Sequence, residues 1–235
     1  MPARSRPVAP RPRSHAEPAP GGPSARERIV HAATAEFARH GYDGARMDAM
    51  AKAAGVNKAL LYYYFPGKAE LYRGLVLEHL GAVAASLEEA AAASADPALA
   101  LAGVVRTLFD LLRDRPEIAG FILREVLNGW GHLKDGDFPI LFRTTRPIAS
   151  LVERGVESGG FRPVRPLFVH LIIIASLNFF TVSRVARARG ARATRLPDID
   201  PDPDEFARFV GELVTRGLAA RPDAAPEPTH PGEPA

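Results

Sequence analysis

Lys58 and three consecutive tyrosines, Tyr62, Tyr63 and Tyr64, are the side chains of this sequence best suited to binding a polyanion. A lysine ammonium group pairs with phosphate oxygens, and each phenol combines a hydrogen-bonding hydroxyl with an apolar ring. On one short helix, such groups fit a surface that meets phosphates and base edges. The alternative is that the tyrosines are half-buried helix residues and that the lysine is an ordinary solvated charge.

Two short helices joined by a tight turn would position these side chains. The apolar spacing from Met47 to Ala51 predicts the first helix, and Asn57 is a suitable N-cap for the second. Between them, Gly55 can take the positive φ that a tight turn requires. Leu61 and Phe65 lie one turn apart and would anchor the second helix on the core. This pattern predicts a helix-turn-helix whose lysine and tyrosines face outward.

Positive charge is concentrated at the amino-terminal end of the chain. Of 30 Lys and Arg and 27 Asp and Glu residues, residues 1–73 hold 12 basic and 6 acidic ones, and residues 74–235 hold the remaining 18 and 21. A polyanionic partner is therefore indicated for one end only. The sequence has no cysteine, which excludes disulfide scaffolds, thiolate metal sites and cysteine nucleophiles and fits a reducing cytoplasm.

The folded part of the chain is predicted to be all-α. Apolar residues recur at helical spacing, and no long stretch alternates with period two. We expect a first helix that begins after Ser24 and stops at Gly41, followed by the two short helices. Further helices are expected over residues 68–93, 101–112, 116–127, 140–157, 166–185 and 202–218.

The segment from Arg26 to Leu75 resembles the amino-terminal domain of the tetracycline-repressor (TetR) family of bacterial transcription regulators. The positions that carry the resemblance, without a gap, are Phe37, Gly41, Tyr42, Ala51, Ala54, Gly55, Val56, Leu61, Tyr62, Tyr64, Phe65, Lys68 and Leu71. The resemblance implies that the helix from Asn57 to Phe65 enters the major groove and that Tyr62, Tyr64 and Lys68 hold phosphates. Over the other two thirds of the chain the resemblance is only general and identifies no ligand.

The sequence departs from the family pattern at four positions. Where the family usually has Thr or Ser to cap the first helix of the motif, this chain has Ala45 and Arg46; an arginine cannot cap, but it could reach a phosphate. Ala59 replaces a residue that is often glycine, and Leu60 replaces a polar one, so Leu60 would pack on a thymine methyl. The candidate DNA-binding residues are Arg46, Asn57, Lys58, Ala59, Leu60, Tyr62, Tyr63, Tyr64 and Lys68.

We expect four segments along the chain. Residues 1–23 form a disordered Pro/Arg-rich arm, residues 24–70 a three-helix DNA-binding domain, residues 71–218 a larger helical ligand-binding and dimerisation domain, and residues 219–235 a disordered tail. The arginines of the arm are more typical of solubilising charge than of groove insertion. No segment has the features of a signal peptide or a membrane span, so a cytoplasmic protein without a membrane partner is expected.

The larger domain is expected to enclose an effector pocket, as the resemblance implies. Pockets are mostly apolar with a few polar groups, and several polar or amphipathic residues lie in or beside its apolar helices. These are Arg124, Glu125, Asn128, Trp130, His132, His170 and Asn178, of which Arg124, Asn128, His170 and Asn178 are the candidate ligand-binding residues. The alternative is that His170 and Asn178 are core residues satisfied by backbone or water. No metal site or cofactor is expected, because no two histidines are spaced four residues apart.

Dimerisation is expected because two helices have apolar faces that a monomer cannot easily cover. The helix over 166–185 is apolar nearly all round, and the helix over 202–218 is amphipathic. Together they could form an intersubunit four-helix bundle, as the resemblance also implies. The candidate interface residues are Phe206, Phe209, Val210 and Leu213.

The function expected from these features is a ligand-responsive DNA-binding transcriptional regulator. It would bind double-stranded DNA as a homodimer, and we expect a repressor that a small apolar or amphipathic effector releases from an inverted-repeat operator. An enzyme is not expected, because no phosphate-binding loop, nucleophile elbow or His-Glu metal motif is present. The alternative is a helical dimeric interaction protein without regulated DNA binding, in which the face of Lys58, Tyr62, Tyr64 and Lys68 would be covered.

Overall fold

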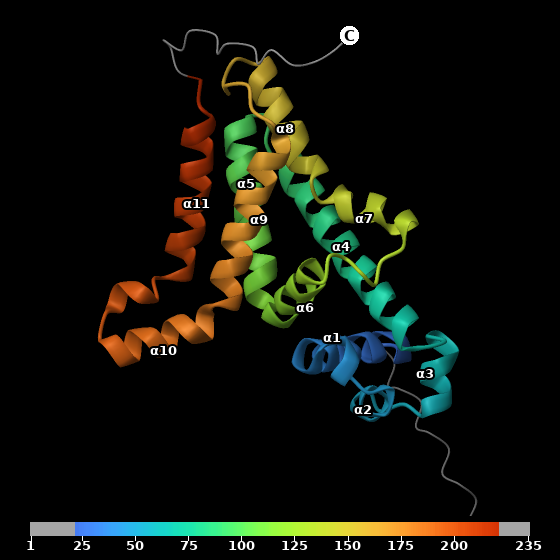
Figure 1. Cartoon of the computed structure of the whole chain (residues 1–235). Helices are drawn as coiled ribbons and strands as arrows, with labels where there is room; N and C mark the ends of the chain where they lie inside the picture. Colours follow the sequence, from blue (N-terminus) through green and yellow to red (C-terminus); the bar gives the residue numbers. More distant parts are fainter. Residues whose placement is uncertain (1–21, 221–235) are drawn as a thin grey trace, which may run out of the picture.

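The computed structural model describes residues 22–220, and in that part the chain is almost entirely helical (Figure 1). The expected all-α fold class is therefore confirmed. In chain order the elements are α1 (Ala25–Gly44), α2 (Met47–Ala53), α3 (Lys58–Tyr64), α4 (Lys68–Ala92), α5 (Pro97–Asp114), α6 (Pro116–Leu127), the 3₁₀ turn η1 (Asp135–Asp137), α7 (Phe138–Arg143), α8 (Arg146–Glu157), α9 (Pro166–Val182), α10 (Arg184–Thr194), the 3₁₀ turn η2 (Pro197–Ile199) and α11 (Pro203–Leu218).

The predicted caps and turns of the first three helices are confirmed. Ser24 and Glu27 form a capping box at the start of α1, and the side chain of Asn57 accepts a hydrogen bond of 2.7 Å from a backbone N–H in the first turn of α3. Gly41 interrupts α1 with a φ of 69°, and Gly55 turns the chain between α2 and α3 with a φ of 65°. A residue with a side chain would be strained at either glycine.

Two hydrophobic cores share the long helix α4. The first core is built from α1, α2, α3 and the first half of α4, and it also includes Phe121 of α6. The second core joins Leu87, near the end of α4, to α5, α8, α9 and α11. The domain boundary that we expected at residue 70 does not separate these cores, because Leu71, Leu75 and Leu80 belong to the first one. The α4 helix crosses from one core to the other without a turn, so the sequence gives no sign of the change.

Two of the expected helices differ in the structure. The helix expected over 140–157 is divided into α7 and α8, because Pro147 has no N–H to continue a helix and stands in the first turn of α8. The helix expected over 166–185 ends at Val182, and α10 follows as a separate helix at an angle of 58°. α10 consists mainly of Arg and Ala and has no buried residue, so apolar periodicity could not predict it.

Ala219 and Ala220, which we expected to begin the loose tail, are bonded to the body. The N–H of Ala220 donates to the carbonyl of Gly160 over 3.0 Å, and the N–H of Arg162 donates to that of Leu218 over 2.8 Å. The expected disorder of the arm and of the rest of the tail lies outside the described residues. Among the described helices, none is by itself long and apolar enough to cross a membrane, and only α9 and α10 taken as one bent pair reach that length and hydropathy.

Candidate nucleic-acid interface

Helix α3 presents its tyrosines to solvent and Leu61 to the core. Leu61 is fully buried and Phe65, which follows the helix, is nearly so; each contributes about 1.5–3 kcal/mol by burial to holding α3 in place. Tyr63 is 79% exposed, and Tyr62 and Tyr64 are 41% and 39% exposed. The three phenols therefore line an accessible face and are not part of the core.

The basic groups around α3 are also exposed. Lys58 Nζ lies 2.7 Å from Asp48 Oδ1 of α2, and the hydrogen bond and charge of this carboxylate raise the pKa of Lys58. Both side chains are more than half exposed, so the pair adds little stability and a phosphate could replace the carboxylate. Arg46 is the N-cap residue of α2 and, as expected from its chemistry, makes no capping hydrogen bond with its side chain, which is exposed.

The other candidate residues at α3 can contact fewer kinds of DNA group. Oδ1 of Asn57 is occupied by the helix cap, so only its amide N–H groups are free to donate. Ala59 is exposed and can offer only a methyl group. Leu60 is partly buried, and the rest of its side chain can pack on an apolar group such as a thymine methyl.

Lys68, which we expected to hold a phosphate, also makes contacts within the chain. Its Nζ donates hydrogen bonds of 3.2 Å to the carbonyl oxygens of Asp43 and Ala45, and it lies 4.7 Å from the centre of the Tyr42 ring. These carbonyls lie at the end of α1, where a cation is favourable. Lys68 thus fastens the start of α4 to the end of α1, and a phosphate contact would have to use its third N–H.

A buried carboxylate links α6 to α4. Glu125 is fully buried, and its Oε2 accepts a hydrogen bond of 3.0 Å from the hydroxyl of Tyr72. The backbone N–H of His132 donates to Oε1 over 3.0 Å, and Nδ1 of the same residue lies 2.8 Å from Oε2. Burial, and then the charge of Glu125, raise the pKa of Tyr72, so its hydroxyl stays protonated and donates. Every polar atom of this carboxylate therefore has a partner, as a buried charge requires.

Tyr42, at the end of α1, brings the amino-terminal domain into the same cluster. The centre of its ring lies 4.2 Å from that of His132 and 5.1 Å from that of Tyr72. Trp130 packs on the same core and has a φ of 60°, which is uncommon for a residue with a side chain. This turn ends α6 and brings the chain back beside Glu125, whose carbonyl accepts a hydrogen bond from the N–H of Trp130. We call Tyr42, Tyr72, Glu125, Trp130 and His132 the joint.

A second contact ties α4 to the segment after α6. Arg73 of α4 donates to both carboxylate oxygens of Asp137, one of them over 2.5 Å. Asp137 is nearly buried, and the Arg73 hydrogen bond holds the pKa of this carboxyl below its usual range. Arg73 follows Tyr72 of the joint directly on α4. These two consecutive residues therefore hold two different segments: Tyr72 holds the end of α6, and Arg73 holds η1.

The four residues expected to contact an effector do not converge on one site. Arg124 and Asn128 are exposed near the end of α6, and Asn178 donates to the carbonyl of Ile174 over 2.8 Å within α9. His170 is different, because it is buried and its Nδ1 has no hydrogen-bond partner in the part of the chain that the structure describes. Burial lowers the pKa of His170, so the ring is held in its neutral form.

Sequence reasoning placed Glu125, Trp130 and His132 near an effector pocket, whereas the structure places them in the joint. A signal for this role was present. Glu125 follows Phe121 by one helical turn and therefore lies on the apolar face of α6. A glutamate on an apolar face needs buried partners, but only the folded chain identifies Tyr72 as the donor.

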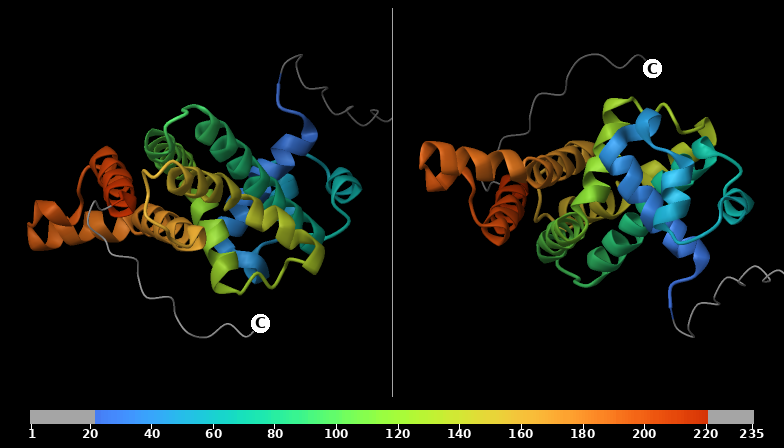
Figure 2. Two further views of the ribbon diagram at one scale, coloured as in Figure 1. Left: turned by 90° about the horizontal axis from the view of Figure 1, so that it is seen from above. Right: turned by 90° about the horizontal axis from the view of Figure 1, so that it is seen from below.

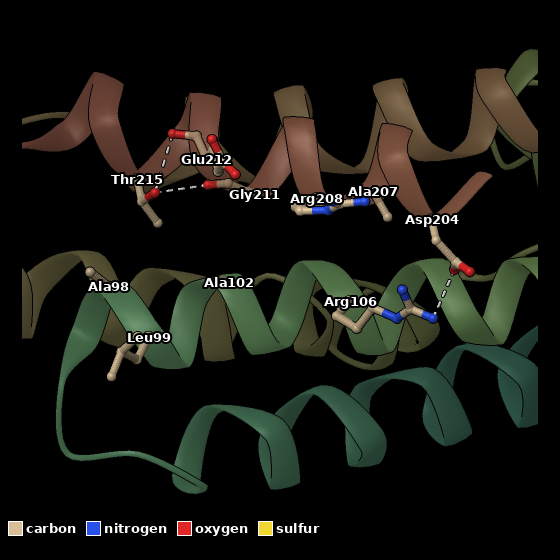
Figure 3. A pocket seen from close by; sticks show the side chains of 10 residues that line it. All are labelled: Ala98, Leu99, Ala102, Arg106, Asp204, Ala207, Arg208, Gly211, Glu212 and Thr215. Atoms are coloured by element: carbon tan, nitrogen blue, oxygen red, sulfur yellow. Dashed lines mark hydrogen bonds and ion pairs between the residues drawn. The ribbon is translucent and has the colours of Figure 1, made fainter. Parts of the chain in front are cut away.

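A groove of about 480 Å³ lies on another surface of the body, between α5 and α11 (Figure 3). Small residues such as Ala102 and Gly211 line it. Arg106 is paired with Asp204 over 2.9 Å, and the hydroxyl of Thr215 donates to the Gly211 carbonyl over 2.9 Å. These polar groups already satisfy one another, so nothing here requires a ligand.

The apolar faces expected to bind a second subunit are partly used within the protomer. Val210 is buried, and Phe206 stacks on Phe180 with ring centres 4.0 Å apart. Phe209 and Leu213, which lie one turn apart on α11, are 59% and 56% exposed. The apolar side chains of α9 that are about half exposed or more are Leu167, Phe168, Leu171, Ile172 and Phe179. Uncovered apolar surface therefore runs along both α9 and α11, while Phe206 and Val210 serve the protomer core.

Comparison with known proteins finds matches to both halves of the chain. Residues 29–75 match the family described as bacterial regulatory proteins, tetR family, and residues 97–196 match a tetracyclin repressor-like C-terminal domain. The HTH-type transcriptional repressor NicS of Pseudomonas putida is 28% identical over 199 residues, which are 82% of this chain and 92% of NicS. The HTH-type transcriptional regulator RutR of Escherichia coli is 30% identical over 158 residues, 66% of this chain and 73% of RutR.

Solved structures show the same fold. The transcriptional regulator FadR from Bacillus subtilis, in complex with stearoyl-CoA, matches with a TM-score of 0.64 at 22% sequence identity. The match covers 81% of this chain and 98% of FadR. The arrangement of an amino-terminal three-helix unit on a larger helical body is thus shared with a regulator of known structure.

Proposed function

This chain belongs to the TetR family of bacterial transcriptional regulators, and from that premise we propose how it binds DNA and how an effector controls the binding. It is a ligand-responsive DNA-binding regulator. We propose that it acts as a repressor, that α3 enters the major groove, and that Tyr62, Tyr64 and Arg46 contact phosphates while Lys58 and Leu60 meet base edges.

The observation that carries this proposal is the exposed face of α3. Three phenols and a lysine face outward on a helix that is held from behind by Leu61 and Phe65. In an interaction protein without DNA binding, this face would be covered. Within residues 22–220 nothing covers it, which favours the DNA-binding function over that alternative.

We propose that the dimer forms through α9 and α11, where Phe179, Phe209 and Leu213 leave apolar surface uncovered. A two-fold dimer presents the same patch from both subunits and carries two equivalent recognition helices. The operator should therefore be an inverted repeat whose half-sites lie on one face of the duplex.

The proposed effector is apolar or amphipathic and binds among α5, α6 and α9, which pack on one another in the body. α9 is rich in large apolar residues, and His170 supplies one buried polar atom without a partner. FadR binds stearoyl-CoA, which makes acyl compounds a reasonable first class to test here. A ligand that donates a hydrogen bond to His170 Nδ1, or accepts one from it, would fit this group.

The joint is the proposed route from the effector to DNA. α6 contacts the proposed effector region on one side and Tyr42 and Tyr72 on the other through Glu125 and His132. An effector that favours one position of α6 would move the amino-terminal domains and so change the distance between the recognition helices. A coupling free energy of about 1–3 kcal/mol is ordinary for such systems, and it is reciprocal.

One experiment tests this proposal in two steps. Purified full-length protein is used to select bound duplexes from a genomic library, and an inverted repeat is the expected result. Acyl compounds and other amphipathic metabolites are then tested for release of that duplex. Selection of sites without two-fold symmetry would overturn the dimer mode, and compounds that bind the body without changing DNA affinity would overturn the control mechanism.

A further inference from the structure

Helix α10 carries the strongest concentration of positive charge in the body. Residues 184–195 include five arginines and no acidic residue, although residues 74–235 as a whole hold 18 basic and 21 acidic residues. The helix is an isolated cationic element on an otherwise acidic domain. We infer that α10 is a second DNA-binding element, which contacts duplex phosphates between the two recognition helices of the dimer.

One of the five arginines fixes the direction of α10. Arg187 lies over the ring of Phe180 at 3.7 Å from its centre, donates to the Ser183 hydroxyl over 2.6 Å and to the Phe180 carbonyl, and pairs with Asp200 over 3.4 Å. These contacts hold the bend between α9 and α10. The other four arginines make none of these contacts.

Arg184, Arg189, Arg192 and Arg195 are exposed. No ion pair or side-chain hydrogen bond involves any of these four within the described residues. Asp198 lies in η2, which packs beside α10, and is exposed, but it is not paired with them either. Among residues 22–220, therefore, no acidic side chain balances the charge of these four arginines.

The position of α10 brings this charge to the DNA-binding end of the molecule. Figure 1 shows α10 leaving the body at the end that carries α1, α2 and α3, which together we call the recognition unit. The view from that end in Figure 2 shows α10 and the recognition unit on opposite sides of the body. α10 continues from the last turn of α9 and returns through η2 to the first turn of α11. If α9 and α11 form the proposed dimer interface, α10 lies beside the two-fold axis, above the duplex that joins the half-sites.

The composition of α10 favours DNA over a protein partner. The residues between its arginines are mainly alanine and glycine, and Val185 is the only larger apolar side chain on the helix. Protein interfaces depend on a few large side chains that fill pockets, whereas phosphate contacts need only cationic groups. Such contacts would raise affinity for any sequence and would not alter which bases are preferred.

The test compares two triple variants with the same change in net charge. Arg189→Gln/Arg192→Gln/Arg195→Gln removes three of the four unpaired positive charges at α10. The control removes three exposed arginines from the opposite end of the body, at the ends of α8 and α11 and just before α9, and is Arg154→Gln/Arg165→Gln/Arg216→Gln. Affinity for a mixed-sequence duplex of about 40 base pairs, long enough for two half-sites, is measured at several salt concentrations with full-length dimers.

We expect the slope of log K against log salt to fall by at least about two units per dimer in the α10 variant, because each lost phosphate contact removes about 0.9. The control variant should keep the slope of the parent protein within a few tenths of a unit. Equal slopes for parent and α10 variant would overturn the inference, and circular dichroism of both variants establishes that each is folded.

The same samples distinguish a contact with the partner subunit. If the arginines pair with the other protomer, sedimentation will show a weaker dimer in the α10 variant, and the salt slope of the dimer-bound complex will not change; that result also overturns the inference. The inference rests on the proposed dimer interface, which charged substitutions on α11 test separately through the oligomeric state alone.

Discussion

The recognition unit and the joint are built from residues at very different distances along the chain. In the recognition unit, the cap of α3 connects residues three apart, Asn57 and Leu60, and the Lys58–Asp48 pair spans ten positions. In the joint, Tyr72 and Glu125 are 53 residues apart, and the neighbouring contact from Arg73 to Asp137 spans 64. The part proposed to read DNA is specified by contacts between residues close in sequence, whereas the part proposed to control it exists only after the two cores have packed together.

The largest expected effect tests whether the recognition unit can bind the operator without a second subunit. Phe209→Asp combined with Leu213→Asp places two charges on the exposed face of α11 and should give monomers at micromolar concentration, as measured by sedimentation. Because the second half-site contact is then no longer intramolecular, operator affinity should fall by about 100-fold or more.

Leu127→Asp is the matched control for this change. Leu127 is 80% exposed and lies on α6, outside the α9 and α11 faces, so the variant should remain a dimer with parental affinity. Dimers of the double α11 variant would contradict the proposed interface.

The joint is tested by removing a single oxygen. Tyr72→Phe deletes the hydroxyl that donates to the buried Glu125 carboxylate, and it should lower the free energy of unfolding by about 1–3 kcal/mol and reduce the effect of an effector on DNA affinity. Tyr63→Phe removes the same atom from a side chain that is 79% exposed, so stability should be unchanged. Equal denaturation midpoints for the two variants would show that the Tyr72–Glu125 hydrogen bond does not contribute to the free energy of unfolding.

Variants of Lys68 and Arg46 separate a structural role from a phosphate contact within the recognition unit. Lys68→Met removes two hydrogen bonds to the end of α1 and should lower stability by about 1 kcal/mol, in addition to any loss of phosphate binding. Arg46→Gln should leave stability unchanged and reduce the salt slope by about 0.9 per half-site. A Lys68 variant with a parental slope and reduced stability would assign this residue a purely structural role.

The smallest expected effect is on the pH dependence of the free energy of unfolding, and it involves one buried histidine in each half of the molecule. Burial lowers the pKa of His79, which lies 3.1 Å from the Thr34 hydroxyl, and of His170. The unfolded state therefore binds more protons than the folded state below about pH 6.5, so the free energy of unfolding should fall as the pH decreases from about 7 to about 5. His79→Gln and His170→Gln should each make this decrease in the free energy of unfolding shallower.

The sequence was sufficient to predict what depends on neighbouring residues. Ser24, Gly41, Gly55 and Asn57 mark the ends and turns of the first helices, and the structure uses each as expected. The fold class followed from periodicity in the same way. Pro147 is also a local signal, and it divides a helix that we expected to be continuous.

What the sequence did not predict depends on distant partners. The ammonium group of Lys68 meets carbonyls at the end of α1, and the carboxylate of Glu125 meets a hydroxyl on α4. Residue type alone could not distinguish these structural roles from a phosphate contact or an effector contact. Val210 likewise has the spacing of an interface residue but is covered by its own protomer, because burial depends on where α5 lies against α11.

The turn that ends α6 has an optical consequence. Trp130 is the only tryptophan in the chain, and it lies in the joint, partly exposed and packed on the amino-terminal core. Indole emission changes with the polarity around the ring, so any shift of α6 against α1 alters the fluorescence of the protein at this one position. The unlabelled regulator therefore carries its own reporter, through which candidate effectors can be ranked in solution before any operator is known.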